Sequence, residues 1–169
     1  MNMQDAAQVA DGVLDVVFRE IRPEVHWTHG PTTAGSCVVS RRRTVMTVIS
    51  EERRGSFLGV VDRFWRKSGY RIAAINDDEI YPAIYAKTDE GFDVSLSFGG
   101  SGQAFFRVDS PCVESSAVAE SRSQPNTPSY EGMENIPRPN IQSDFWSATG
   151  VAGATLPSGA SGASGASGG

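Results

Sequence analysis

Hydrophobic residues recur every three or four positions in two segments, which is the spacing of one buried face on a helix. Residues 5–21 form the first predicted helix, with Asp5 as its N-cap and Pro23 beyond its end, where the ring breaks the hydrogen-bond ladder. Residues 51–68 form the second, with Ser50 as its N-cap. The apolar positions of the first helix are Ala6, Val9, Val13, Val17 and Ile21.

In the predicted strands, apolar residues recur at every second position instead. Residues 103–109 alternate apolar and polar side chains, and residues 69–76 and 80–88 are shorter strands bounded by turn residues. Residues 37–50 are rich in β-branched side chains and form either one long strand or a strand pair with residues 41–43 as its turn. The clearest alternation is in residues 92–98, where Phe92, Val94, Leu96 and Phe98 are separated by Asp93, Ser95 and Ser97.

This order of elements predicts an α+β fold. A helix, a strand region and a second helix precede a meander of about four strands. We expect an antiparallel sheet of about four to six strands, with two helices packed on one face and a mostly irregular C-terminal tail behind it.

The composition changes after residue 113, so residues 1–113 are expected to form the α+β domain. Residues 114–156 are rich in Pro and Ser and are predicted to be extended, and residues 157–169 repeat Ser-Gly-Ala as a flexible linker. Residues 141–146 are the expected docking segment, because Phe145 and Trp146 stand out in this polar region. This segment either packs on its own domain or binds a partner as a short peptide.

Charge and hydropathy exclude two classes of function. The 169-residue chain has 20 acidic and 15 basic side chains, a net charge of −5. A nucleic-acid partner is not expected, because phosphate binding needs a clustered basic surface. No apolar run approaches the length of a membrane span. We expect a monomeric domain.

The two cysteines lie at the ends of the predicted body. Cys37 precedes the first strand region and Cys112 follows the last strand. They form either a disulfide or two buried reduced thiols. A disulfide would close a loop of 75 residues and contribute roughly 4 kcal/mol in the chain-entropy model. It would also indicate an oxidising compartment. Residues 1–20 lack the pattern of a signal peptide, so a secreted form would be the mature part of a longer product.

Several short motifs resemble those of small secreted or lipid-anchored actinobacterial proteins of unknown function, over about residues 27–112. The resemblance implies a cell-envelope location and a disulfide, and it supplies no catalytic residues. The motifs are Trp27, Gly35-Ser36-Cys37, Val60, Trp65, Gly69-Tyr70, Asp89-Glu90-Gly91-Phe92 and Ser110-Pro111-Cys112.

Candidate chemistry is sparse. His26 and His29 are the only histidines, and no nearby thiol or carboxylate completes a metal site with them. We therefore expect a loop there, and neither a metal nor a cofactor. Cys37 with one of these histidines would make a hydrolase nucleophile, but only if its thiol is free. The acidic turns at 77–79 and 89–90 are expected to be solvated rather than to bind Ca²⁺.

Basic clusters are the remaining candidate for binding. Arg41, Arg42 and Arg43, together with further arginines of the second helix, would attract anionic partners such as cell-wall polymers or lipid headgroups if they formed one patch. A solvated surface balanced by neighbouring acids is the alternative.

Together these observations favour a non-enzymatic extracytoplasmic module that binds an unknown protein or cell-envelope component, or has a structural role there. The expected contacts are Phe145, Trp146 and residues 41–43. Two alternatives remain: a hydrolase with a Cys/His site, and a cytosolic interaction protein with free thiols.

Overall fold

The predicted α+β class is confirmed by the structure, a computed structural model that describes residues 1–128, 130 and 135–150. Two helices and a seven-stranded sheet make up the described part, and the predicted linker at 157–169 lies outside it. The elements are α1 (Met3–Glu20), β1 (Trp27–His29), β2 (Thr33–Ala34), β3 (Val39–Val45), α2 (Glu51–Lys67), β4 (Arg71–Asn76), β5 (Ala83–Lys87), β6 (Asp93–Phe98) and β7 (Ala104–Asp109).

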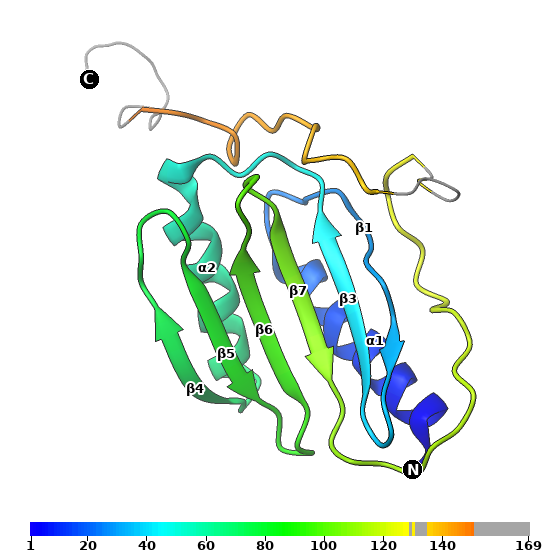
Figure 1. Cartoon of the computed structure of the whole chain (residues 1–169). Helices are drawn as coiled ribbons and strands as arrows, with labels where there is room; N and C mark the ends of the chain where they lie inside the picture. The colour runs from blue at the N-terminus through cyan, green and yellow to red at the C-terminus, as the bar shows by residue number, and fades with distance from the viewer. Residues whose placement is uncertain (129, 131–134, 151–169) are drawn as a thin grey trace.

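The sheet has the order β1-β3-β7-β6-β5-β4, with β2 paired to β3, and every pairing is antiparallel. Helix α1 packs on β3 and β7, and α2 packs on β4 and β5. Both helices therefore lie behind the sheet in Figure 1, and no described helix covers the face toward the viewer.

Helix α1 begins at Met3, two residues earlier than the sequence predicts. Asn2 is the N-cap, and it forms a capping box in which its side chain accepts from the backbone of Asp5 while the Asp5 carboxylate accepts from the backbone of Asn2. The prediction that Asp5 is the cap was wrong, because Asn2 supplies the side chain that satisfies the free amide groups. Ser50 does stand at the N-cap of α2, but its hydroxyl donates to the carbonyl of Ala148 instead.

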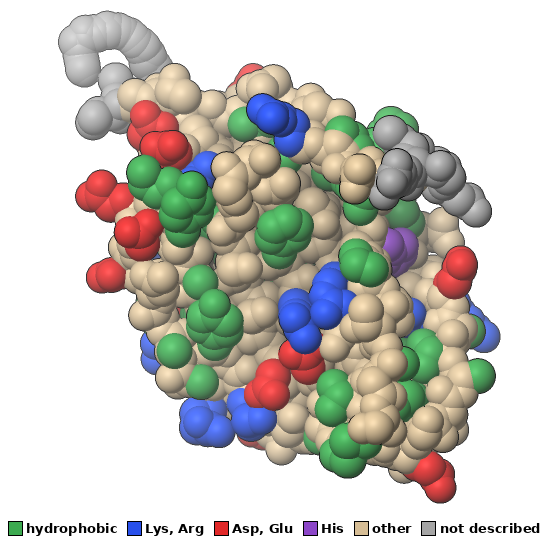
Figure 2. All heavy atoms as spheres, in the orientation of Figure 1, with side chains coloured by type: hydrophobic (Ala, Val, Ile, Leu, Met, Phe, Trp, Pro, Cys, Tyr) green, Lys and Arg blue, Asp and Glu red, His purple; other side chains and the backbone are tan. Residues whose placement is uncertain are grey.

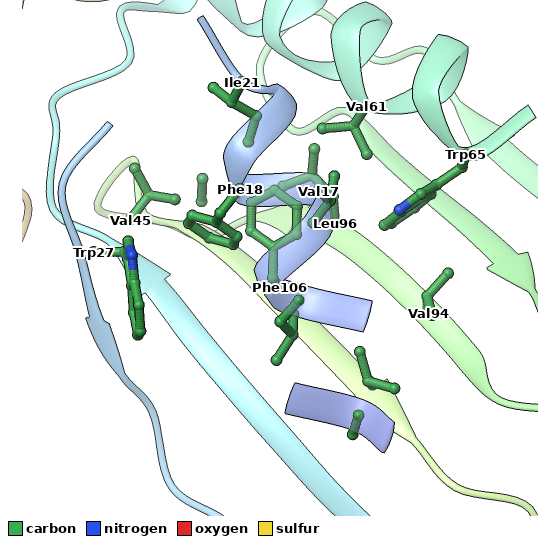
Figure 3. Packing of buried hydrophobic residues seen from close by; sticks show 14 of the residues in the cluster. Val17, Phe18, Ile21, Trp27, Val45, Val61, Trp65, Val94, Leu96 and Phe106 are labelled. Atoms are coloured by element: carbon green, nitrogen blue, oxygen red, sulfur yellow. The ribbon is translucent and has the colours of Figure 1, made fainter. Parts of the chain in front are cut away.

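The core fills the space between the helices and the inner face of the sheet (Figure 3). Phe18 of α1 meets Phe106 of β7 with ring centroids 4.7 Å apart, and Trp65 of α2 is fully buried. Inward positions of the strands alternate as predicted for 92–98, so Val94, Leu96 and Phe98 are buried. This alternation assigns the intervening residues to the opposite face.

Residues 41–43 were wrongly considered as a turn, because they lie in the middle of β3. Arg41 and Arg43 point inward with Val39 and Val45, and both are buried. Their charges are paired with α1: Arg41 Nε lies 3.2 Å from Asp11, and Arg43 Nη2 lies 2.5 Å from Asp15. The two acids are four residues apart on one face of the helix, which matches the two-residue step of the arginines along the strand.

The described residues after 113, which are 114–128, 130 and 135–150, contain no helix or strand of the fold, but several of them pack on the domain. In Figure 1 they run along the β1 side of the sheet and return across the upper end. Asn126 accepts from the Trp27 amide and donates to the Val25 carbonyl. Ile141 forms a bridge with Thr47, and its carbonyl accepts from the amide of Val48.

Candidate functional site

The uncovered face of the sheet carries three rows of side chains. Each row runs across β3, β7, β6 and β5 and consists of outward residues that are register partners. The middle row joins Arg42, Arg107, Ser95 and Tyr85 on four neighbouring strands. The row above it joins Thr44, Phe105, Ser97 and Ala83, and the row below joins Ser40, Asp109, Asp93 and Lys87. We call this surface the open face.

A groove of about 770 Å³ runs over this face. Its floor lies along β6, because the outward residues Ser95 and Ser97 have small side chains. Tyr85 on β5 and Phe105 on β7 flank these serines, and 46% and 39% of their surfaces are exposed. In Figure 2 separate hydrophobic side chains stand on this face, with Lys and Arg beside them. Two aromatic rings on either side of a groove with polar groups in its floor make this face a candidate binding surface.

Two arginines lie directly opposite each other in the middle row. Arg42 on β3 is the register partner of Arg107 on β7, and like charges at such positions repel. Burial lowers the pKa of the Arg42 guanidinium, and the positive charge of Arg107 lowers it further, while Asp109 opposes this shift. A negatively charged group beside the two arginines therefore reduces their repulsion. Asp109 does this in part, through a 2.8 Å ion pair with Arg107.

Neighbouring groups hold these side chains in place. The Arg42 guanidinium donates to the Pro31 carbonyl and to the Thr33 hydroxyl, at 3.1 and 2.9 Å. A Cβ atom added to Gly30 would lie 3.0 Å from the Cβ of Arg42. Gly99 leaves room for the ring of Phe105 in the same way, since an added Cβ would lie 2.6 Å from it. Both groove walls thus pack against glycines.

The structure separates the three arginines that the sequence placed in one patch. Only Arg42 faces the groove, because Arg41 and Arg43 occupy inward positions of the same strand. The guanidinium of Arg43 lies 3.9 Å from the centre of the Trp27 ring and 5.2 Å from that of Phe18. Burial lowers the pKa of Arg43, and the hydrogen bond that its guanidinium donates to Asp15 opposes this effect. Arg41 and Arg43 therefore stabilise the α1–sheet contact.

Phe145 and Trp146 behave differently from each other. Trp146 is 1% exposed, its ring meets Phe57 edge-on at 5.0 Å, and its Nε1 donates to the carbonyl of Pro23. Phe145 remains 38% exposed beneath the guanidinium of Arg53, 4.3 Å from the ring centre. Of the two alternatives for this segment, the structure has it packed on its own domain.

Cys37 and Cys112 form a disulfide, which confirms the expected pairing. Their Cα atoms are 4.7 Å apart, and the Val113 amide donates to the Cys37 carbonyl beside them. The bond therefore joins the start of β3 to the end of β7, which are neighbouring strands of the sheet. With its sulfur in this bond, Cys37 has no thiol to act as a nucleophile.

The histidines lie at the sheet edge, where the sequence predicted a loop. His29 belongs to β1, and its Nε2 lies 2.8 Å from the carbonyl oxygen of Ser123, while His26 is exposed just before the strand. Within the described residues, no group of three His, Cys, Asp or Glu side chains could hold a metal ion.

Three residues of the open face were not singled out from the sequence: Tyr85, Phe105 and Arg107. The alternating pattern marks each as an outward position of its strand. Both helices were expected on one face of the sheet, but the pattern of a single strand does not contain the register that places these three side chains near Arg42.

Comparison with known proteins gives little further information. No family model matches the chain, and no curated protein does. Among solved structures, a DUF4853 family protein from Actinomyces odontolyticus is similar over 79% of this chain and 71% of that chain, with 14% identity and a TM-score of 0.32. Its source is an actinobacterium, as in the sequence resemblance, but a TM-score this low carries no conclusion about fold or function. Nor is any described helix long and apolar enough to cross a membrane.

Proposed function

We propose that this chain is a non-enzymatic extracytoplasmic binding module whose open face holds an anionic glycopolymer of the cell envelope. The observation that carries the proposal is the middle row, which places Arg42 and Arg107 side by side and Tyr85 two strands further along. With strands about 4.8 Å apart, the row from Arg42 to Tyr85 is about 14 Å long, enough for more than one sugar ring.

The chemistry of the row fits such a ligand. Paired guanidinium groups bind carboxylates and phosphates, which would relieve their mutual repulsion. The apolar C–H face of a sugar ring can pack on an exposed aromatic ring, whose π face is electronegative. Ser95 and Ser97 offer hydroxyls in the floor between Tyr85 and Phe105. Fixed polar groups around an aromatic groove suit a repeating polar chain.

The disulfide supports the extracytoplasmic part of the proposal, because such bonds persist in oxidising compartments. The test is the intact mass of unreduced protein after alkylation, with the protein exported to an oxidising compartment. We expect no alkylated cysteine before reduction and two afterwards. Two alkylated cysteines before reduction would contradict the extracytoplasmic assignment and favour the cytosolic alternative.

Binding is tested by calorimetry on the unreduced protein with polygalacturonate, poly(glycerol phosphate) and neutral dextran. The first two separate carboxylate from phosphate recognition. We expect binding to at least one of them, weakened by salt, and none to dextran. Arg42→Gln/Arg107→Gln should reduce the affinity about tenfold or more, since two charge-assisted contacts are lost.

The matched control removes two charges from the opposite side of the molecule. Arg63 and Lys67 are exposed on α2, and Arg63→Gln/Lys67→Gln makes the same change in net charge. This variant should bind as the wild type does. Equal loss in both variants would mean attraction by overall charge and would overturn the proposed site.

A further inference from the structure

The tail contacts one edge strand of the sheet, β1, but no described strand pairs with the outer side of the other edge strand, β4. At the β1 edge, the tail covers the backbone: the Trp27 amide donates to Asn126, and the His29 ring contacts Ser123. At the other edge, β4 pairs only with β5, and within the described residues no strand lies on its outer side. Five of its six residues are exposed. An unpaired strand edge is a template on which an extended peptide can add.

An apolar groove lies beside this edge. It measures about 530 Å³ and lies between the first turns of α2 and the loop from β4 to β5. Leu58 and Gly55 contribute from the helix, while Ile75 and Ile80 contribute from the strand and the loop, with 43% and 42% of their surfaces exposed. Large aliphatic side chains this exposed, and grouped beside an open strand, indicate a contact surface.

The rim of this groove is acidic. Glu51 and Glu52 line it from α2, and residues 77–79 line it from the loop. No ion pair found within the described residues involves any of these five carboxylates. Figure 2 shows the acidic side chains gathered at the upper left, around hydrophobic ones, where Figure 1 has the start of α2 and the β4–β5 loop.

The loop is held in one conformation. A carboxylate oxygen of Asp78 accepts from the amides of Ile80 and Tyr81, at 3.1 and 2.8 Å. The buried Arg54 donates to the carbonyl of Ile80 from below. The groove is therefore preformed, which lowers the entropy cost of binding.

We propose that this β4 surface, independently of the open face, binds an extended basic segment of another protein. The segment adds as a strand along residues 74–76, beyond the irregularity between Ile72 and Ala74. Its apolar side chains enter the groove at Ile75 and Ile80, and its Lys or Arg side chains meet the acidic rim. A second copy of this chain is the poorer occupant, because pairing two such edges would bring two acidic rims together.

The test uses a fluorescent peptide of alternating Lys and Val residues and the full-length, unreduced protein. Fluorescence anisotropy should show binding that weakens with salt. Asp77→Asn/Glu79→Gln should weaken it about three- to tenfold, as expected for two exposed charge contacts. Asp78 is left intact because it holds the loop. Asp89→Asn/Glu90→Gln is the matched control, since it removes two charges from the exposed turn between β5 and β6. This variant should bind normally.

Strand addition is tested separately by methylating every second backbone amide of the peptide. Methyl groups on the edge that pairs with β4 should abolish binding, and methyl groups on the opposite edge should not. The proposal would be overturned if the peptide did not bind, or if the two charge-removing variants lost affinity equally. It would also be overturned if both methylated peptides bound equally well. Concentration-dependent dimerisation that competes with the peptide would overturn it as well. None of these results bears on the open face, which the glycopolymers test with other residues.

Discussion

At the residue scale, a buried arginine contacts two aromatic rings and one carboxylate. Arg43 is 1% exposed, and its guanidinium lies beside the rings of Trp27 and Phe18 while Asp15 supplies the counter-charge. Asp15 also accepts from the Ser123 hydroxyl, so the same carboxylate joins α1 to the tail. A buried charge that loses its partner is costly, whereas an apolar substitute for both members is often tolerated.

We therefore expect Asp15→Asn to lower the free energy of unfolding by about 1–3 kcal/mol, since Arg43 keeps its charge without a full partner. The double variant Arg43→Met/Asp15→Asn should be more stable than Asp15→Asn alone, because no buried charge remains. Urea denaturation measures these two variants and Arg43→Met alone. If the double variant loses the sum of the two single effects instead, the pair does not act as a coupled unit.

The raised pKa of Tyr70 predicts that the stability of the fold falls at alkaline pH. Burial raises the pKa of the Tyr70 phenol above the ordinary value of 10.0, and the charges of Glu90 and Asp89 add to this effect. The unfolded state then loses the phenolic proton first, so stability that is present below pH 10 is lost as pH rises through the folded pKa. Tyr70→Phe should show a shallower loss in this range. Parallel curves for the two proteins would exclude Tyr70 as the cause.

At the scale of elements, the irregular tail acts as part of the fold. Besides the contacts of Trp146, the Ser147 hydroxyl donates to Val48 and the Ser50 amide donates to the Trp146 carbonyl. These bonds fix the connection from β3 to α2, which orients the second helix on the sheet. The tail therefore substitutes for a further strand or helix at this end.

Trp146→Ala should lower the free energy of unfolding by about 3–5 kcal/mol, as for other buried aromatic side chains. Phe145→Ala is the control, because much of that ring is already exposed, and its effect should stay under about 1 kcal/mol. Thermal denaturation distinguishes the two variants. Similar melting temperatures would show that Trp146 contributes no more than its exposed neighbour, contrary to its packing here.

The disulfide links the residues just before β3 to those just after β7. Cys37→Ser/Cys112→Ser should lower stability by roughly 4 kcal/mol, because the unfolded chain regains the freedom of a 75-residue loop. The loss should appear equally in wild-type protein under reducing conditions, which serves as the internal control. A much smaller loss in both cases would mean that β3 and β7 pair without help from the bond.

The fold class followed from the sequence because each element has a clear period and its own turn residues. Residues 92–98 show this best, since every apolar position is buried as expected. Arg41 and Arg43 could not be assigned inward in this way, because a charged residue interrupts the apolar alternation. Their positions become intelligible only with Asp11 and Asp15 of α1 opposite them, a match across elements that no local pattern contains.

The candidate site was less accessible to sequence reasoning for a related reason. The alternation places Tyr85 and Phe105 on the outward side of their strands, but an outward side is a functional surface only if no element covers it. Both helices were expected on one face, so the missing information was the strand register, which decides which outward side chains are neighbours. Arg42 was included among the expected contacts, yet its partner Arg107 lies 65 residues later, and only the strand register brings them together.

At the scale of the whole molecule, the sheet has three distinct surfaces. The inner face holds the core, the open face carries arginines and aromatic rings, and the β4 edge carries carboxylates around an apolar groove. The proposed ligands of the two outer surfaces have opposite charge. One domain could then hold an anionic polymer and a basic protein segment at the same time, as an adaptor does.

The central claim is that the open face binds an anionic glycopolymer, and a nuclear magnetic resonance titration tests it most directly. Short polygalacturonate or poly(glycerol phosphate) fragments are added to the unreduced, isotope-labelled protein. We expect the helices to be unchanged and the perturbed amides and side chains to cluster around the groove, at Arg42, Tyr85, Ser95, Ser97, Phe105 and Arg107. Perturbation confined to α2 or the tail, or none at all with either polymer, would contradict it.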